Sequence, residues 1–168
     1  MRILFACVVL MLLISCDDGD LQIATIDFDS ASLEFCDTQT TTSSTVFFKL
    51  NATEALILDL QSGVLKNEVS DGTLTSSVPS QSQITYRTFS DNVAKGYFCD
   101  AIPPTTPTVV EEILAQGGEV LITTIQNETD TTQYDHTIEL SGISLVRDNG
   151  ERVTDLTISN FGTISTTE

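Results

Sequence analysis

Tyr134-Asp135-His136-Thr137-Ile138-Glu139-Leu140 is the stretch that decides the fold. Its even-numbered residues carry aromatic, imidazole or aliphatic side chains, and its odd-numbered residues carry carboxyl or hydroxyl groups. Alternation with a period of two residues predicts a β-strand that has one buried and one solvated face. We expect Gly142 to bend this strand and residues 143–146 to continue it.

Similar short segments recur along the chain and are separated by turn signals. In residues 46–50, Val46, Phe48 and Leu50 alternate against Phe47 and Lys49. The Asp148-Asn149-Gly150 sequence predicts a hairpin with a type I′ turn. The other expected strands cover residues 21–28, 33–35, 55–60, 73–78, 83–89, 119–126, 152–159 and 161–164. This spacing is typical of an all-β protein.

A single helix is expected between Pro107 and the Gly117-Gly118 pair. Thr108 and Glu111 fit a capping box, and the apolar residues of 109–114 form one stripe at helical spacing. A glycine pair is a common helix end. The predicted fold is therefore an antiparallel β-sandwich, immunoglobulin-like or jelly-roll-like, with eight or nine strands and one short helix that covers one end.

The charge of the chain excludes one large class of functions. The 168 residues include 24 acidic and 7 basic side chains, which gives a formal net charge of -17. Nucleic-acid binding depends on Lys and Arg contacts to phosphates, so we expect no nucleic-acid partner. The same charge disfavours anionic polysaccharides and is compatible with cations, basic partners or simple solubility.

The N-terminus carries a second informative pattern. Arg2 precedes an apolar run over residues 3–14, which ends in Leu13-Ile14-Ser15-Cys16. The run is shorter than the ~20 residues that a membrane-spanning helix needs. It has the parts of an export signal, and its last four residues resemble the lipobox of bacterial lipoproteins. The resemblance implies a type II signal peptide over residues 1–15, cleavage between Ser15 and Cys16, and lipid on Cys16. A plain secretory signal that is cut elsewhere is the alternative.

The resemblance also implies a domain organisation and a location. Residues 16–20 form an acidic tether, Cys16-Asp17-Asp18-Gly19-Asp20, and residues 21–168 form one β-sandwich domain. Acidic residues after the lipidated cysteine resemble the signal that sends some lipoproteins to the cell surface. In enteric bacteria, an Asp at this place resembles an inner-membrane retention signal. We expect a lipid anchor in the outer membrane and exposure at the surface, with the periplasmic face as the alternative.

Two of the four cysteines remain for pairing once Cys7 is cleaved off and Cys16 is lipidated. Cys36 and Cys99 each lie in a Phe-Cys-Asp tripeptide. An exported chain meets an oxidising compartment, so a Cys36–Cys99 disulfide is expected, with two buried free thiols as the alternative. It would connect the N-terminal part to the strand before the helix.

The side chains that carry out catalysis show no recognisable pattern. His136 is the sole histidine and is interpreted as a packing residue in its strand. Glu111 and Glu112 are interpreted as solvated acids of the first helical turn. Asp27-x-Asp29 and the acidic tether do not match a calcium loop, although oxygen ligands for Ca²⁺ remain an alternative. We therefore expect no catalytic residue, no metal site and no cofactor.

These observations favour a non-enzymatic, lipid-anchored protein that binds or supports another envelope component, protein or glycan. The ligand-binding residues are not identified by any motif. A surface glycan-binding module is the first alternative, and clustered exposed tyrosines among Tyr86, Tyr97 and Tyr134 would favour it. A hydrolase that uses two carboxyl groups is the second alternative.

Overall fold

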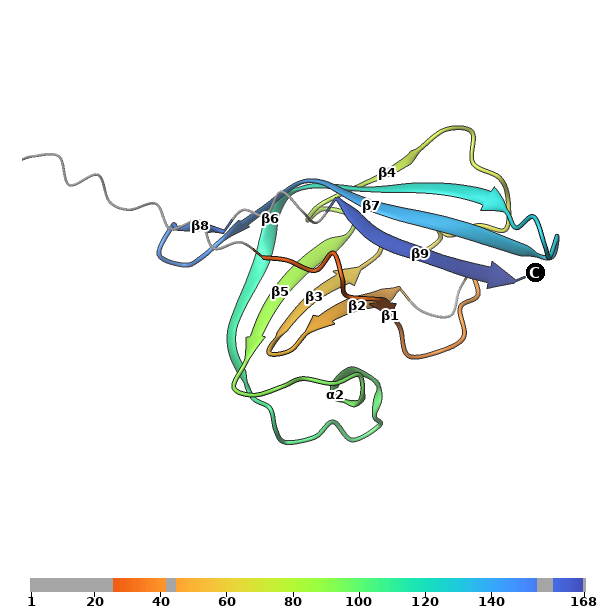
Figure 1. The fold of residues 1–168 in the computed structure, drawn as a ribbon. Coiled ribbons are helices and arrows are strands. Elements are labelled where there is room, and N and C mark those ends of the chain that lie inside the picture. The colour runs from red at the N-terminus through yellow and green to blue at the C-terminus, as the bar shows by residue number, and fades with distance from the viewer. Residues whose placement is uncertain (1–25, 42–44, 154–158, 168) are drawn as a thin grey trace, which may run out of the picture.

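The computed structural model describes residues 26–41, 45–153 and 159–167. The expected signal peptide, Ser15, Cys16 and the acidic tether lie outside these residues. The described part contains nine strands and one short helix, and all of its strand pairs are antiparallel (Figure 1). The elements are β1 (Leu33–Glu34), β2 (Val46–Asn51), β3 (Glu54–Asp59), β4 (Leu74–Ser77), β5 (Gln83–Phe89), α2 (Gly96–Cys99), β6 (Val109–Gln126), β7 (Gln133–Val146), β8 (Arg152–Val153) and β9 (Asn160–Thr167). The predicted all-β antiparallel sandwich is confirmed.

The strands form two layers that share β6. The first layer has the order β1-β2-β3-β5-β6 and uses residues 109–114 of β6. The second layer has the order β4-β6-β7-β9 and uses residues 119–126 of β6, while β8 pairs with the end of β7. Figure 1 shows β6 running from the lower layer into the upper one. The layers are therefore joined along one strand, and β1 and β9 lie at their other ends.

The predicted helix between Pro107 and Gly117-Gly118 is wrong, because residues 109–126 are the single strand β6. Its first half is held by backbone pairing with β5, a contact that local sequence cannot reveal. The β-branched side chains of 109, 110 and 113 suit a strand, and this tertiary pairing decides between two periods that the sequence allows. Gly117 and Gly118 form an irregularity within β6 instead of a helix end.

Gly118 is required where β6 passes between the layers. Its φ of +121° is a conformation that L side chains rarely adopt. A Cβ at this position would lie 2.8 Å from the backbone Cα of Ile143 on β7. The glycine therefore allows β6 and β7 to approach closely at the bend.

The main core lies between the two layers. Phe47, Leu56 and Ile84 contribute from the first layer, and Ile138 and Phe161 contribute from the second. All five side chains are at most 1% exposed. The alternation of 134–140 predicted this face correctly for Ile138.

A second, smaller core covers the outer face of the first layer. Phe48, Ala55, Ile57 and Phe89 pack there under α2. Phe98 of α2 stacks on Phe48 with 4.5 Å between ring centroids. Strand β2 is therefore buried on both faces. The alternation of Phe48 against Phe47 and Lys49 is confirmed, but each of its two sides faces a core.

The predicted Cys36–Cys99 disulfide is confirmed. Cys36 follows β1 closely, while Cys99 is the last residue of α2 instead of part of a strand. The bond therefore fastens the helix that covers the second core to the N-terminal edge of the first layer.

Two further local predictions need correction. Residues 26–28 contain no strand, and 21–25 lie outside the described residues.

The β7–β8 turn is not type I′, because Gly150 has φ +83° while Asn149 does not have a positive φ. Gly150 N donates to Arg147 O and Arg147 N donates to Glu151 O, both at 2.9 Å. This is the longer hairpin turn with a glycine bulge. The sequence predicts a strand over 152–159. Strand β8 corresponds to its beginning, and residues 154–158 lie outside the described residues.

Candidate functional site

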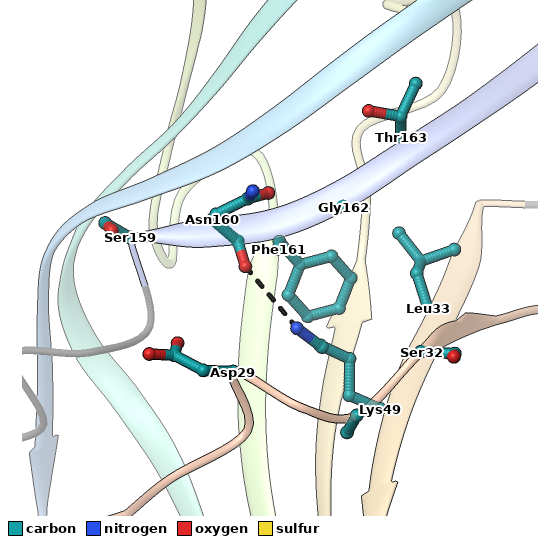
Figure 2. A pocket seen from close by; sticks show the side chains of 10 residues that line it. Asp29, Ser32, Leu33, Lys49, Ser159, Asn160, Phe161, Gly162 and Thr163 are labelled. Atoms are coloured by element: carbon teal, nitrogen blue, oxygen red, sulfur yellow. Dashed lines mark hydrogen bonds between the residues drawn. The ribbon is translucent and has the colours of Figure 1, made fainter.

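A polar groove of about 650 Å³ opens between the ends of the two layers, where β1 and β9 come together. The segment before β1 and the start of β9 form its walls, and β2 contributes one side chain from below (Figure 2). Its polar lining consists of Asp29, Ser32, Lys49, Ser159, Asn160 and Thr163. The volume is within the range of pockets that hold small molecules.

Lys49 is the central side chain of the groove. In β2 it faces inward, next to Leu33 of β1 and Leu56 of β3. It is only 5% exposed, although lysine is almost never fully buried without a partner. Its Nζ donates one long hydrogen bond of 3.4 Å to the backbone oxygen of Asn160 (Figure 2).

The Lys49 ammonium has no ion-pair partner within 4.0 Å among residues 26–41, 45–153 and 159–167. Burial lowers its pKa below the ordinary 10.5, and the more distant carboxylates of Asp29 and Asp27 oppose this shift. An ammonium group has three donors. Among the described residues one of these reaches an acceptor, so donor capacity faces the groove.

Asp29 places a carboxylate at the rim. Its backbone N–H donates to Asp27 Oδ1 at 2.9 Å, and Asn51 Nδ2 donates to the backbone oxygen of Asp27 at 3.1 Å. Asp27 therefore holds the turn through its hydrogen bonds, whereas Asp29 lines the groove (Figure 2). Within the described ranges, no three His, Cys, Asp or Glu side chains gather closely enough to hold a metal ion.

The floor of the groove is tightly packed. Phe161 is 1% exposed and lies near the stem of Lys49 (Figure 2). Gly162 has φ +141°, and a Cβ there would lie 2.8 Å from Cβ of Leu33. Glycine at this position therefore lets β9 approach β1, and the groove has a fixed floor.

His136 lies outside the groove in a buried network. Its Nδ1 and Nε2 each lie 2.8 Å from a threonine hydroxyl, of Thr124 and Thr166 respectively. The hydroxyl of Thr166 donates to Asn67 Oδ1 at 2.6 Å, so its oxygen accepts from Nε2–H and Nδ1 accepts from Thr124. Burial lowers the pKa of His136 below 6.5, which favours this neutral form. His136 therefore packs in the interior, and both of its ring nitrogens also make hydrogen bonds.

The acidic pair Glu111-Glu112 is divided between two faces of β6. Glu111 binds Arg147 at 2.8 Å, and Glu112 binds Arg87. The interpretation of both residues as acids of a first helical turn is wrong, because they lie on strand β6. Each is held in an ion pair, and neither lines the groove of Lys49.

The three tyrosines do not form a shared surface. Tyr86 is buried in the main core, and its hydroxyl donates to Glu54 at 2.5 Å, while Tyr97 belongs to α2 and packs on Phe89 of β5. Burial, together with Glu54, raises the pKa of Tyr86. Tyr134 lies at a different place, where it pairs with Gln126 of β6 and Thr166 of β9. The aromatic cluster that would favour glycan stacking is therefore not present among these residues.

Sequence reasoning did not find Lys49. A lysine among Phe47, Phe48 and Leu50 looks like the polar side of an alternating strand. Its burial depends on β9, which lies more than a hundred residues further along the chain. No local signal marks the contact.

Comparisons with protein-family models, with curated proteins and with solved structures gave no match to this chain. No helix in the described part of the chain is long and apolar enough to cross a membrane.

Proposed function

We propose that this protein is a lipid-anchored envelope protein whose sandwich domain acts as a non-enzymatic binding module. The observation that carries the anchor is the apolar run over residues 3–14 that ends in Leu13-Ile14-Ser15-Cys16. Two or three acyl chains on Cys16 give stable attachment to a bilayer. The acidic tether supports a place at the outer membrane, exposed at the cell surface, with the periplasmic face as the alternative.

The groove of Lys49 supports a binding role for the domain. It combines one cationic donor at Lys49, one carboxylate acceptor at Asp29 and the hydroxyl groups of Ser32 and Ser159. This set is suited to a small polar ligand, because each ligand hydroxyl or carboxyl group finds a matching partner. It favours the glycan-binding alternative in a form that does not depend on aromatic stacking.

The anchor is tested by mass spectrometry of the mature N-terminus. Cleavage before Cys16 and acyl chains on that residue are the expected result. A Cys16→Ala chain should leave the membrane fraction, and protease treatment of intact cells should degrade the native chain if it is surface-exposed. A native product that retains residues 1–15 and no fatty acid would contradict the proposal.

The binding role is tested by capture from detergent-solubilised membranes with the full acylated chain. Co-purification of an envelope protein or glycan is expected. Recovery of the chain alone, together with the absence of any small bound ligand by mass spectrometry, would count against a binding module.

A further inference from the structure

We infer that the groove of Lys49 binds a small ligand that carries one carboxylate beside hydroxyl groups, as an acidic monosaccharide does. This inference rests on the proposed binding function and assigns its ligand class. The first step is the state of Lys49, which is 5% exposed and has one long hydrogen bond, to a neutral carbonyl group. Removing an ammonium group from water costs free energy unless a counter-charge or several acceptors replace the water.

A carboxylate is the group that best completes this site. Charge-assisted hydrogen bonds from an ammonium to a carboxylate are shorter and about twice as strong as neutral ones. The hydrogen bond to Asn160 (Figure 2) leaves donors of Lys49 for the ligand, and the groove that Lys49 lines has a volume of about 650 Å³. A bound carboxylate would provide the counter-charge that the described residues do not place within 4.0 Å.

Asp29 limits the ligand to a single negative charge near this end. Its carboxylate lies on the rim of the same groove and is exposed. A second anionic group there would be repelled, whereas a ligand hydroxyl would donate to Asp29. The overall charge of -17 adds to the repulsion of polyanions.

Hydroxyl groups fit the remaining lining. Ser32 and Ser159 of the lining carry hydroxyls that both donate and accept, and Asn160 presents its backbone oxygen to Lys49. The apolar ring of Phe161 is buried in the floor, so the groove offers no open aromatic face to an apolar ligand. A compact ligand with several hydroxyls satisfies more of these groups than a simple carboxylic acid does.

Titration calorimetry with the full acylated chain in detergent tests this inference, with D-glucuronate as the probe. Glucuronate should bind, and the neutral probes glucose and glucuronamide should bind about ten- to a hundred-fold more weakly, because they lack the charge-assisted contact. Acetate should also bind weakly, because it lacks the hydroxyls.

Lys49→Met is the decisive variant, and Lys66→Met is its control. Lys66 is exposed and pairs with Glu68, so its loss removes one positive charge away from the groove. The Lys49→Met chain should bind glucuronate about ten- to a hundred-fold more weakly than the native chain. The Lys66→Met chain should bind it with the native affinity. Asp29→Asn should weaken the preference for hydroxyl-rich probes over acetate.

Three results would overturn the inference: no glucuronate binding, equal binding by the native and Lys49→Met chains, or acetate binding as tightly as glucuronate. The last result would mean an adventitious ion only. A chain that fails these titrations but still captures an envelope partner would refute the ligand class and leave the binding function intact.

Discussion

Lys49 is a nearly buried lysine whose ammonium group retains hydrogen-bond donors for a ligand. Its side chain reaches from the inner face of β2 to Asn160 of β9, and the residue as a whole is 5% exposed although its ammonium borders the groove. If Lys49 stabilises the fold, its substitution should lower the free energy of unfolding. If Lys49 serves a ligand, its substitution should leave that free energy unchanged or raise it. The free energy of unfolding therefore separates the two roles.

We predict that Lys49→Met leaves the free energy of unfolding unchanged or raises it by up to roughly 2 kcal/mol, because the apolar stem is kept and the buried charge is removed. Urea unfolding followed by circular dichroism measures this. Leu56→Ala, in the same core, is the control and should cost about 2–5 kcal/mol. A loss of more than about 1 kcal/mol in Lys49→Met would identify the lysine as a structural residue.

His136 should make stability depend on pH. Burial lowers its pKa in the folded chain, so between that value and about 6.5 the unfolded chain binds more protons. The free energy of unfolding should therefore fall as the pH decreases from about 7.5 to about 5.5, by at most about 1.4 kcal/mol per pH unit.

His136→Gln should remove this component, because glutamine does not titrate and still offers a hydrogen-bonding group to Thr124 or Thr166. Urea unfolding at several pH values compares the two chains. Parallel curves for native and variant chains would show that His136 does not control the slope.

At the scale of elements, β6 is the decisive strand. It pairs with β5 in its first half and with β4 and β7 in its second half, and it changes layer near Gly117 and Gly118. The two glycines are adjacent, yet their surroundings differ. A Cβ on Gly118 would meet Ile143, whereas a Cβ on Gly117 would have no atom within 4 Å.

Gly118→Ala should lower the free energy of unfolding by at least about 2 kcal/mol, because the new Cβ meets backbone atoms and the φ of +121° is unfavourable for alanine. Gly117→Ala is the matched control and should change it by less than about 0.5 kcal/mol. Thermal unfolding of both variants provides the comparison. Equal effects would mean that close approach to β7 is not what requires Gly118.

The sequence predicted most strands but not their partners. Alternation located β2, β5 and β7, and a continuous apolar run located β3, to within about one residue at most ends, because both patterns are local. The stretch 107–118 failed because its apolar spacing fits a helix as well as a strand, and β5 decides the outcome. Residues 96–99 form the helix instead, where Tyr97 and Phe98 cover the outer face of the first layer.

The candidate site was less predictable than the fold. It is built from residues 29–33, one side chain of β2 and the start of β9, which are far apart in the chain. The cysteine pair was predictable because oxidation leaves few choices, whereas the burial of Lys49 depends on how two layers meet. A site that is assembled from residues far apart in the chain leaves no motif in any one stretch of sequence.

At the scale of the whole molecule, one covalent bond holds the smaller core in place. The Cys36–Cys99 disulfide closes a loop between positions separated by 63 residues and fastens α2 over Phe48 and Phe89. Closing a loop of this length restricts the unfolded chain strongly. The bond thus stabilises both the covering helix and the layer beneath it.

Replacing both cysteines, as Cys36→Ser with Cys99→Ser, should lower the free energy of unfolding by about 4 kcal/mol in the chain-entropy description. Guanidinium unfolding measures the loss, and the native chain under a thiol reductant should behave like the double variant. A reductant that leaves the native chain as stable as before would show that the bond adds nothing to the fold.

The shared strand has a consequence for the groove of Lys49. The two layers are joined through β6 and come together again where Gly162 of β9 lies against Leu33 of β1, so the two walls of the groove belong to different layers. A substitution that alters the bend of β6 at Gly118 would change how one layer is placed against the other, and with it the spacing of these walls. If the groove binds a ligand as proposed, substitutions at this bend should alter that binding without contacting the bound molecule.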